Sequence, residues 1–190
     1  MLTHKGTQTI ETTRLTLRRF SIDDADAMYR NWASDPEVTK YLSWPTHTDI
    51  SVSRTVTSDW ENNYDKPAYY QWAIVYKPLG EPIGCISAVH VDERIEAVEI
   101  GYCIGRTWWH MGVMTEALTA VTDFFFAEVG VNRVAARHDA ENLRSGMVMR
   151  RCGMTCEGTL RASLWNNRGI CDCVHYSILR DEWEKRRSSR

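Results

Sequence analysis

One segment of the chain has the residue types of a phosphate-binding turn. Residues 95–104 alternate as a strand, residues 105–112 form a short loop, and an apolar helix is expected to begin at Val113. The first turn of a helix carries unpaired N–H groups and the positive end of the helix dipole, and these groups bind anions. Gly112 would let the backbone approach an anion closely. The alternative is a tight strand–helix turn that binds nothing.

Hydrophobic periodicity places this segment within a longer run of elements. The expected strands cover residues 14–20, 71–77, 82–92, 95–104, 133–137, 154–164 and 171–179. The expected helices lie between Ser21 and Pro36 and over residues 49–64, 113–129, 142–151 and 181–187. The strand–helix–strand unit over residues 95–137 requires a parallel crossover, whereas the short joints elsewhere favour antiparallel neighbours. The order predicts one α/β domain with a central mixed, mostly antiparallel sheet and helices on both faces.

The composition is that of a globular protein. The chain has 190 residues, of which 43% are hydrophobic and 25% charged, and its formal net charge is −2. This balance excludes disorder as a global description and argues against direct nucleic-acid binding. No apolar run approaches the roughly 20 residues of a membrane helix, and the first eleven residues lack the apolar core of a signal peptide. We therefore expect a cytoplasmic protein without a membrane partner.

The expected domain covers residues 12–183. Residues 1–11 are polar and are expected to form a loose leader, and residues 184–190 are expected to form a basic tail. The cysteines and histidines do not have the spacings of a zinc site or a disulfide framework, so no metal is expected.

The segment Trp109-His-Met-Gly-Val-Met-Thr-Glu-Ala117 resembles the acetyl-CoA loop of the GCN5-related N-acetyltransferases, the GNAT superfamily. The family pattern is Gln/Arg-x-x-Gly-x-Gly/Ala. The branch that acetylates the N-termini of ribosomal proteins often has Trp-Gly-x-Gly-Tyr-Ala/Met-Thr-Glu-Ala. Trp109 stands at the Gln/Arg position and Gly112 at the glycine. His110 replaces the first glycine of the branch, and Met114 is bulkier than the small residue of the family.

Further matches follow in the order expected for the family. Asn142-Leu-Arg-Ser145 resembles the Asn-x-x-Ser helix start, and Gly153-Met154 resembles the Gly-Phe that closes this helix. Residues 13–19 resemble the first strand of the branch. The resemblance covers about residues 12–183, and it implies the same α/β fold that the periodicity predicts.

The resemblance implies transfer of an acetyl group from acetyl-CoA to a primary amine by direct attack in a ternary complex. The residues implied at the donor are Ile104, Trp109, His110, Met111, Gly112, Val113, Met114, Thr115, Asn142 and Ser145. Backbone N–H groups from Gly112 to Thr115 would hold the pyrophosphate. Ile104 would offer main-chain groups to the pantetheine arm and to the carbonyl, and Asn142 would hydrogen-bond the arm. Glu116 would repel phosphate if it faced the site, so we expect its side chain to point away.

Acetyl transfer requires a base for the amine and a proton for the leaving thiolate. Glu99 is the candidate base, because the family often places a carboxylate on this strand. By alternation its side chain shares a face with that of Cys103. Glu96 is a rival, and a solvent-facing or ion-paired Glu99 is the alternative.

The sequence offers several candidates for the general acid. Met149 stands where much of the family has a tyrosine, so the resemblance leaves this role open. Ser145 is the nearest hydroxyl by motif, although a hydrogen bond to the helix backbone is its alternative role. Tyr102 and Tyr176 also remain candidates.

The favoured acceptor is a protein or peptide N-terminus, by resemblance to the ribosomal-protein branch. Tyr41 and Trp44 would shape the acceptor site, or would pack beneath their loop. The alternatives are an acetyltransferase of small amines such as polyamines, amino acids or aminoglycosides, and a CoA-binding module without catalysis. A homodimer is compatible with the family.

Overall fold

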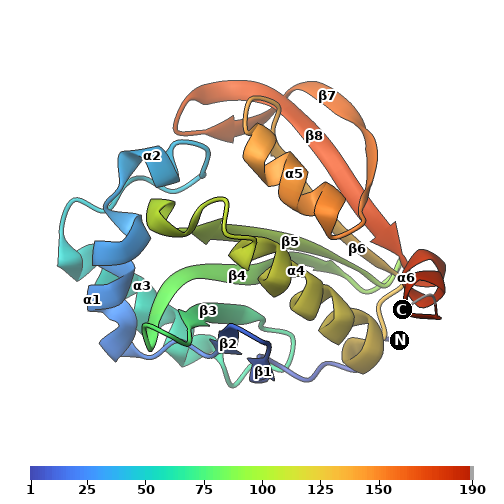
Figure 1. The fold of residues 1–190 in the computed structure, drawn as a ribbon, viewed down its shortest axis with the longest axis horizontal. Coiled ribbons are helices and arrows are strands. Elements are labelled where there is room, and N and C mark those ends of the chain that lie inside the picture. Colours follow the sequence, from blue (N-terminus) through green and yellow to red (C-terminus); the bar gives the residue numbers. More distant parts are fainter. Residues whose placement is uncertain (189–190) are drawn as a thin grey trace.

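The computed structural model describes residues 1–188, which fold around one eight-stranded sheet (Figure 1). The strands are β1 (Ile10–Glu11), β2 (Leu15–Arg18), β3 (Gln71–Tyr76), β4 (Glu81–Asp92), β5 (Ala97–Ile104), β6 (Arg133–Asp139), β7 (Thr155–Asn166) and β8 (Gly169–Leu179). Their order in the sheet is β1-β2-β3-β4-β5-β6-β8-β7. Strands β5 and β6 are parallel, and the other neighbours are antiparallel. The mixed, mostly antiparallel sheet is therefore confirmed.

Helices cover both faces of the sheet. They are α1 (Ala25–Met28), α2 (Pro36–Thr39), α3 (Ile50–Asn63), α4 (Val113–Phe124), α5 (Leu143–Arg151) and α6 (Arg180–Ser188). Single turns of other helical types lie at Ile22–Asp24, Tyr29–Ala33, Arg106–Trp108 and Phe125–Val129. The expected single helix between Ser21 and Pro36 is thus divided into shorter helical turns, and its apolar face still packs on the sheet.

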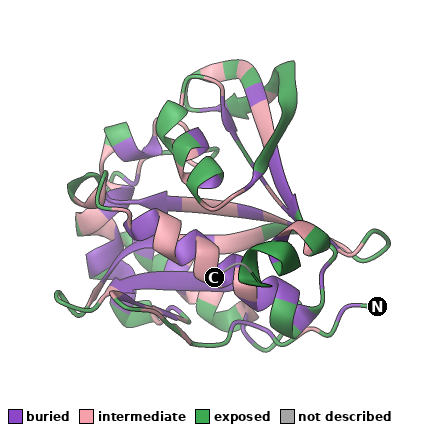
Figure 2. Cartoon of the chain, turned by 45° about the vertical axis from the view of Figure 1, so that its right-hand side comes forward, coloured by how far each residue is buried: buried purple, intermediate pink, exposed green. Residues whose placement is uncertain are grey.

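Strand β3 shows why the sheet needs two covering layers. Trp72 and Ile74 are fully buried in the core cluster that includes α4, whereas Ala73 and Val75 are buried against α1 and the turn that follows it. Alternate side chains of a strand point to opposite faces, so a strand that is apolar at every position must be covered on both. The central strands are accordingly buried, while β7 at the edge is largely exposed (Figure 2).

The parallel pairing of β5 and β6 ends before either strand does. It runs from Ala97 with Arg133 to Ile100 with Ala136. Beyond this point β5 continues beside β4 to Ile104, and β6 continues beside β8 to Asp139. The two strands therefore separate at their carboxyl ends, next to the start of α4 and the start of α5.

The expectation of a loose leader over residues 1–11 is wrong. Leu2 is buried in the main core, and Ile10–Glu11 pairs with β2. Thr7 is buried as well, where its hydroxyl donates to the Tyr69 carbonyl at 3.0 Å and accepts from the Gln71 N–H at 3.0 Å. The polar composition of residues 1–11 did not indicate that this segment packs on the domain, because its polar groups form hydrogen bonds with the edge of β3.

The carboxyl end is helical up to Ser188. The expected helical turn over residues 181–187 is confirmed as part of α6, so residues 184–188 of the expected tail belong to a helix. Trp183 packs on Phe126, and its indole N–H donates to Asp123 at 2.6 Å. Residues 189 and 190 of the expected tail lie outside the described residues.

Candidate functional site

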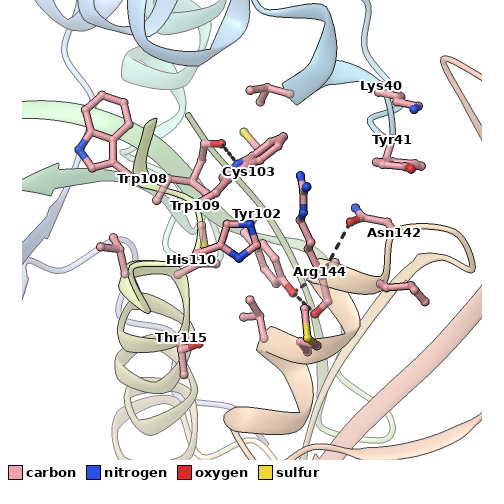
Figure 3. A pocket seen from close by; sticks show the side chains of 18 of the residues that line it. Lys40, Tyr41, Tyr102, Cys103, Trp108, Trp109, His110, Thr115, Asn142 and Arg144 are labelled. Atoms are coloured by element: carbon pink, nitrogen blue, oxygen red, sulfur yellow. Dashed lines mark hydrogen bonds between the residues drawn. The ribbon is translucent and has the colours of Figure 1, made fainter. Parts of the chain in front are cut away.

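A cavity of about 460 Å³ opens where β5 and β6 separate (Figure 3). Its volume lies within the usual range of small-molecule sites. The lining residues come from the end of β5, the turn before α4 and the start of α4, from α5 and the loop before it, and from α2 and the segment after it. They are Glu37, Val38, Lys40, Tyr41, Leu42, Tyr102, Cys103, Ile104, Trp108, Trp109, His110, Gly112, Val113, Met114, Thr115, Glu141, Asn142, Leu143, Arg144, Ser145, Met147, Val148 and Arg151.

The start of α4 forms one wall of the cavity. Gly112 precedes the helix in the left-handed conformation, with a φ of 72°, and Gly112 to Thr115 all line the cavity. The first N–H groups of an α-helix have no partner within the helix, and the dipole adds positive potential there. This wall therefore has the arrangement that binds a phosphate group.

Glu116 belongs to the same helical turn but faces away from the cavity. Its carboxylate accepts hydrogen bonds from the Thr12 hydroxyl at 2.6 Å, the Arg14 N–H at 2.8 Å and Arg14 Nε at 2.7 Å. Burial alone would raise the pKa of Glu116, but these hydrogen bonds and the Arg14 charge together lower it. The expectation that Glu116 points away is confirmed.

Arg14 also fixes the turn that leads into α4. Its Nη1 donates to the Met111 carbonyl at 2.8 Å, while its Nε is held by Glu116. The Met111 side chain itself is 43% exposed and does not line the cavity. The backbone of the turn is thus tied to the region before β2.

The end of β5 presents main-chain groups to the cavity. The Gly105 N–H donates to the Ile83 carbonyl at 2.9 Å, and Ile104 lies opposite Gly84. In antiparallel pairs, hydrogen-bonded and non-hydrogen-bonded positions alternate. The main-chain groups of Ile104 are therefore directed away from β4, toward the gap. The indole N–H of Trp109 donates a hydrogen bond to the Ile104 carbonyl at 3.0 Å.

Two contacts connect the β5 side of the cavity with α5. The Arg144 guanidinium lies over the Trp109 ring, 4.6 Å from its centre. The Tyr102 hydroxyl lies 2.9 Å from Ser145 Oγ (Figure 3). Asn142 caps α5, with Oδ1 accepting from the Ser145 N–H at 3.4 Å.

The turn between β7 and β8 holds the segment after α2, which forms the far rim of the cavity. The Asn167 side-chain amide donates to the carbonyls of Thr39 at 2.9 Å and Trp44 at 2.8 Å. The Asn167 N–H donates to the Leu42 carbonyl at 3.1 Å. Tyr41 lines the cavity within this segment, with the Arg168 guanidinium 5.5 Å from its ring centre. This turn and α2 lie close together in Figure 1.

A buried carboxylate anchors the same turn to β6. Asp139 is 2% exposed and accepts from the Asn166 amide at 2.7 Å and from the Glu141 N–H at 2.8 Å. Burial would raise the pKa of Asp139, but these hydrogen bonds and the charge of Arg168 lower it. Arg168 in turn pairs with Glu141 at 2.6 Å.

Most of the residues expected at the site line this one cavity. They are Tyr41, Ile104, Trp109, His110, Gly112, Val113, Met114, Thr115, Asn142 and Ser145. Glu99, Trp44 and Met111 do not line it. The Glu99 carboxylate pairs with Arg137 on β6 at 2.9 Å, and the Trp44 ring packs against His47 with ring centres 5.3 Å apart.

Several lining residues carried no signal in the sequence. The charged ones are Glu37, Lys40, Glu141, Arg144 and Arg151, of which the last three belong to α5 or the loop before it. Their spacing along that segment, at positions 141, 144 and 151, is compatible with one side of a helix but gave no indication of a cavity. Within residues 1–188, no group of three or more His, Cys, Asp and Glu side chains is arranged to hold a metal ion. Likewise, no helix of this part of the chain is long and apolar enough to cross a membrane.

Comparison with known proteins identifies relatives over nearly the whole chain. The family described as the acetyltransferase (GNAT) domain matches residues 14–155. An uncharacterized N-acetyltransferase, p20, of Bacillus licheniformis is 31% identical over 176 residues, which cover 93% of this chain and 98% of the relative. The [ribosomal protein uS5]-alanine N-acetyltransferase of Escherichia coli is 31% identical over 93 residues, covering 49% of this chain and 48% of the relative.

A solved structure of a ribosomal L7/L12 alpha-N-protein acetyltransferase shares the fold. Its TM-score is 0.81 at 20% identity, and the match covers 92% of this chain and 99% of that one. The α/β architecture deduced from the periodicity is therefore confirmed.

The Glu116 network predicts a pH-dependent loss of stability. We expect Glu116→Gln to lower the free energy of unfolding at pH 7 by on the order of 2 kcal/mol, because three hydrogen bonds to a carboxylate are lost or weakened. The folded pKa of Glu116 is lowered, so this contribution is present above the unfolded pKa and is lost as pH falls through the folded one. Urea unfolding from pH 7 to pH 3 tests this, with the exposed Glu128→Gln as control. An equal deficit at both pH values would contradict it.

The backbone at His110 predicts a stabilising substitution. His110 has a φ of 62°, in the left-handed region where glycine is favoured. We expect His110→Gly to raise the free energy of unfolding by about 0.5–1 kcal/mol. Glycine relieves the backbone strain of the folded state, and this gain exceeds the cost of the larger conformational entropy that glycine gives the unfolded chain. Ala162 on β7 also has a left-handed backbone, with a φ of 48°. Ala162→Gly is therefore the matched control, because it changes a left-handed residue to glycine without removing an imidazole. A loss of stability in His110→Gly alone would show that the imidazole makes contacts that outweigh the strain.

Proposed function

Because the chain belongs to the GNAT acetyltransferase family, we propose that it acetylates the amino terminus of a protein or peptide, by direct attack of the amine in a ternary complex. The chain is an N-acetyltransferase, and acetyl-CoA is its acetyl donor. The acceptor, the order of the chemistry and the residue roles are the proposed part.

The cavity at the end of β5 is the observation that supports this proposal. It combines an anion-binding helix start with the main-chain groups of Ile104 and the hydroxyls of Tyr102 and Ser145. A CoA thioester has this sequence of chemical groups, with a charged pyrophosphate followed by an amide-containing arm and then the reacting carbonyl. The cationic side chains of Lys40, Arg144 and Arg151 at the cavity also suit a phosphate-rich donor.

In this proposal the chain positions the donor mainly through its backbone. N–H groups from Gly112 to Thr115 hold the pyrophosphate, together with the turn formed by Trp109, His110 and Met111. Asn142 binds the pantetheine arm from α5. The Ile104 N–H, which is directed toward the gap, donates to the carbonyl oxygen as it gains charge during attack. The Ile104 carbonyl already accepts the Trp109 indole N–H at 3.0 Å, and the N–H of Ile104 is the group that can donate to the thioester carbonyl.

The acceptor amine must lose a proton before it can attack. We assign this step to Glu99, acting through water, because its side chain lies on the β5 face that also carries Cys103 of the cavity. Arg137 on β6 pairs with Glu99 at 2.9 Å and holds its carboxylate in place. Glu37 and Glu141 are the carboxylates that line the cavity itself, and they are the comparison residues for this assignment.

A protein N-terminus is the acceptor that the relatives favour. The E. coli relative is named for the alanine terminus of a ribosomal protein, and another E. coli relative is named a ribosomal-protein-serine acetyltransferase. In this proposal the chain end enters at the cavity rim near Tyr41, which the β7–β8 turn holds in place from outside the cavity.

Thiol release from acetyl-CoA with a panel of acceptors tests the proposed function. We expect amine-dependent release with peptides that carry a free N-terminus, and none with the same peptides after N-terminal blocking. Release with polyamines, amino acids or aminoglycosides instead would replace the peptide acceptor by a small amine. CoA binding without release for any acceptor would favour a binding module and would contradict catalysis.

Substitution of Glu99 tests the base. We expect Glu99→Gln to lower kcat about 100-fold while the affinity for acetyl-CoA stays unchanged, because only the proton acceptor is removed. Glu37→Gln and Glu141→Gln are measured beside it by the same steady-state assay. Unaltered turnover in Glu99→Gln, with a loss in one of the other two variants, would transfer the role to that carboxylate.

A further inference from the structure

Tyr102 and Ser145 meet across the cavity from elements that are far apart in sequence. Tyr102 lies on β5, and Ser145 lies in the first turn of α5. The Tyr102 hydroxyl is 2.9 Å from Ser145 Oγ and 3.2 Å from the Ser145 carbonyl oxygen. Both residues line the cavity, as does Ile104.

The donors and acceptors of Tyr102 and Ser145 allow two hydrogen-bond arrangements. A tyrosine hydroxyl has a single hydrogen, and a carbonyl oxygen can only accept. If Tyr102 donates to the carbonyl, the Ser145 hydroxyl can donate to Tyr102 and is not available to a ligand. If Tyr102 donates to Ser145 Oγ, the hydrogen of Ser145 is free to turn into the cavity.

Burial keeps Tyr102 in the form that can donate. Removal from water raises the pKa of Tyr102, and this effect outweighs the opposite effect of its hydrogen bond to Ser145. The phenol is therefore protonated throughout the physiological pH range, and Tyr102 is not itself suited to release a proton. It is suited to hold the Ser145 oxygen in one orientation.

We propose that Tyr102 is a positioning residue, which donates to Ser145 Oγ so that the Ser145 hydroxyl can donate to the leaving sulfur of CoA. This inference rests on the proposed acetyl transfer. As the C–N bond forms, the C–S bond breaks and its electron pair stays on sulfur. The Ser145 O–H donates a hydrogen bond to that thiolate, and the proton lost by the amine passes to the base.

Because Tyr102 acts through Ser145 in this proposal, the single and double variants should lose kcat in a particular pattern. We expect Tyr102→Phe to lower kcat roughly 10-fold, the size of one well-placed hydrogen bond, with KM for acetyl-CoA within about twofold of wild type. Ser145→Ala should lose at least as much. The double variant should be no slower than Ser145→Ala, because Tyr102 acts only through the serine.

Tyr176 on β8 provides a matched control, because its hydroxyl contacts the same helix, α5. Its hydroxyl accepts from Arg150 Nε of α5 at 2.9 Å, and it does not line the cavity. Tyr176→Phe therefore removes a tyrosine hydroxyl that contacts α5 without touching the site. We expect it to lower thermal stability while kcat stays at the wild-type value. An equal kcat loss in Tyr102→Phe and Tyr176→Phe would show that Tyr102 supports only the fold, and would overturn the proposal.

A binding measurement separates this proposal from the proposed function. Titration of the thiol of bound CoA, followed by the ultraviolet absorbance of its thiolate, requires no acceptor. We expect wild-type protein to lower the pKa of the bound thiol, and both Tyr102→Phe and Ser145→Ala to return it toward the free value. This result would support the proposal even if no amine were acetylated. A bound thiol pKa that is the same in wild type and both variants, or no CoA binding, would overturn it.

Discussion

The site depends on the place where two parallel strands stop pairing. Strands β5 and β6 share hydrogen bonds only as far as Ile100 and Ala136, and each then follows its antiparallel neighbour. A strand edge released from its partner presents N–H and C=O groups that need other partners. At this gap those groups face a cavity, so they are available to hydrogen-bond a ligand. The start of α4 and the start of α5 lie beside the gap because each helix follows one of the two strands.

The positions of the charged side chains then decide which kind of ligand the gap can bind. A helix start attracts anions, but the first turn of α4 contains a carboxylate that would oppose this. Arg14 and Thr12 draw the Glu116 side chain to the opposite side of the helix, where its charge is compensated. The same arginine holds the Met111 carbonyl. One ion pair thus removes a negative charge from the anion site and fixes the turn that forms it.

The rim of the cavity at Tyr41 is built from parts of the chain that meet only in the folded protein. The β7–β8 turn reaches the segment after α2 through Asn167, whose amide bonds to Thr39 across 128 residues of sequence. Asp139 fastens the same turn to β6, beside the residues that start α5. The polar contacts of Asn167 and of the buried Asp139 therefore form a network that joins the β7–β8 turn to the segment after α2 and to the loop before α5. Such networks specify a single arrangement when every member is satisfied.

The sequence by itself determined most of the elements and the turn at Gly112, because both depend on residues close together in the chain. Apolar periodicity, helix caps and the spacing around Gly112 act over at most a few turns, and the resemblance over residues 109–117 is equally local. The insertion of β8 between β6 and β7, the ion pair of Glu99 with Arg137 and the contact of Tyr102 with Ser145 were decided by tertiary structure. The last two join residues 38 and 43 positions apart. No local pattern encodes such pairs, since they depend on which strands become neighbours in the sheet and on where that pairing ends.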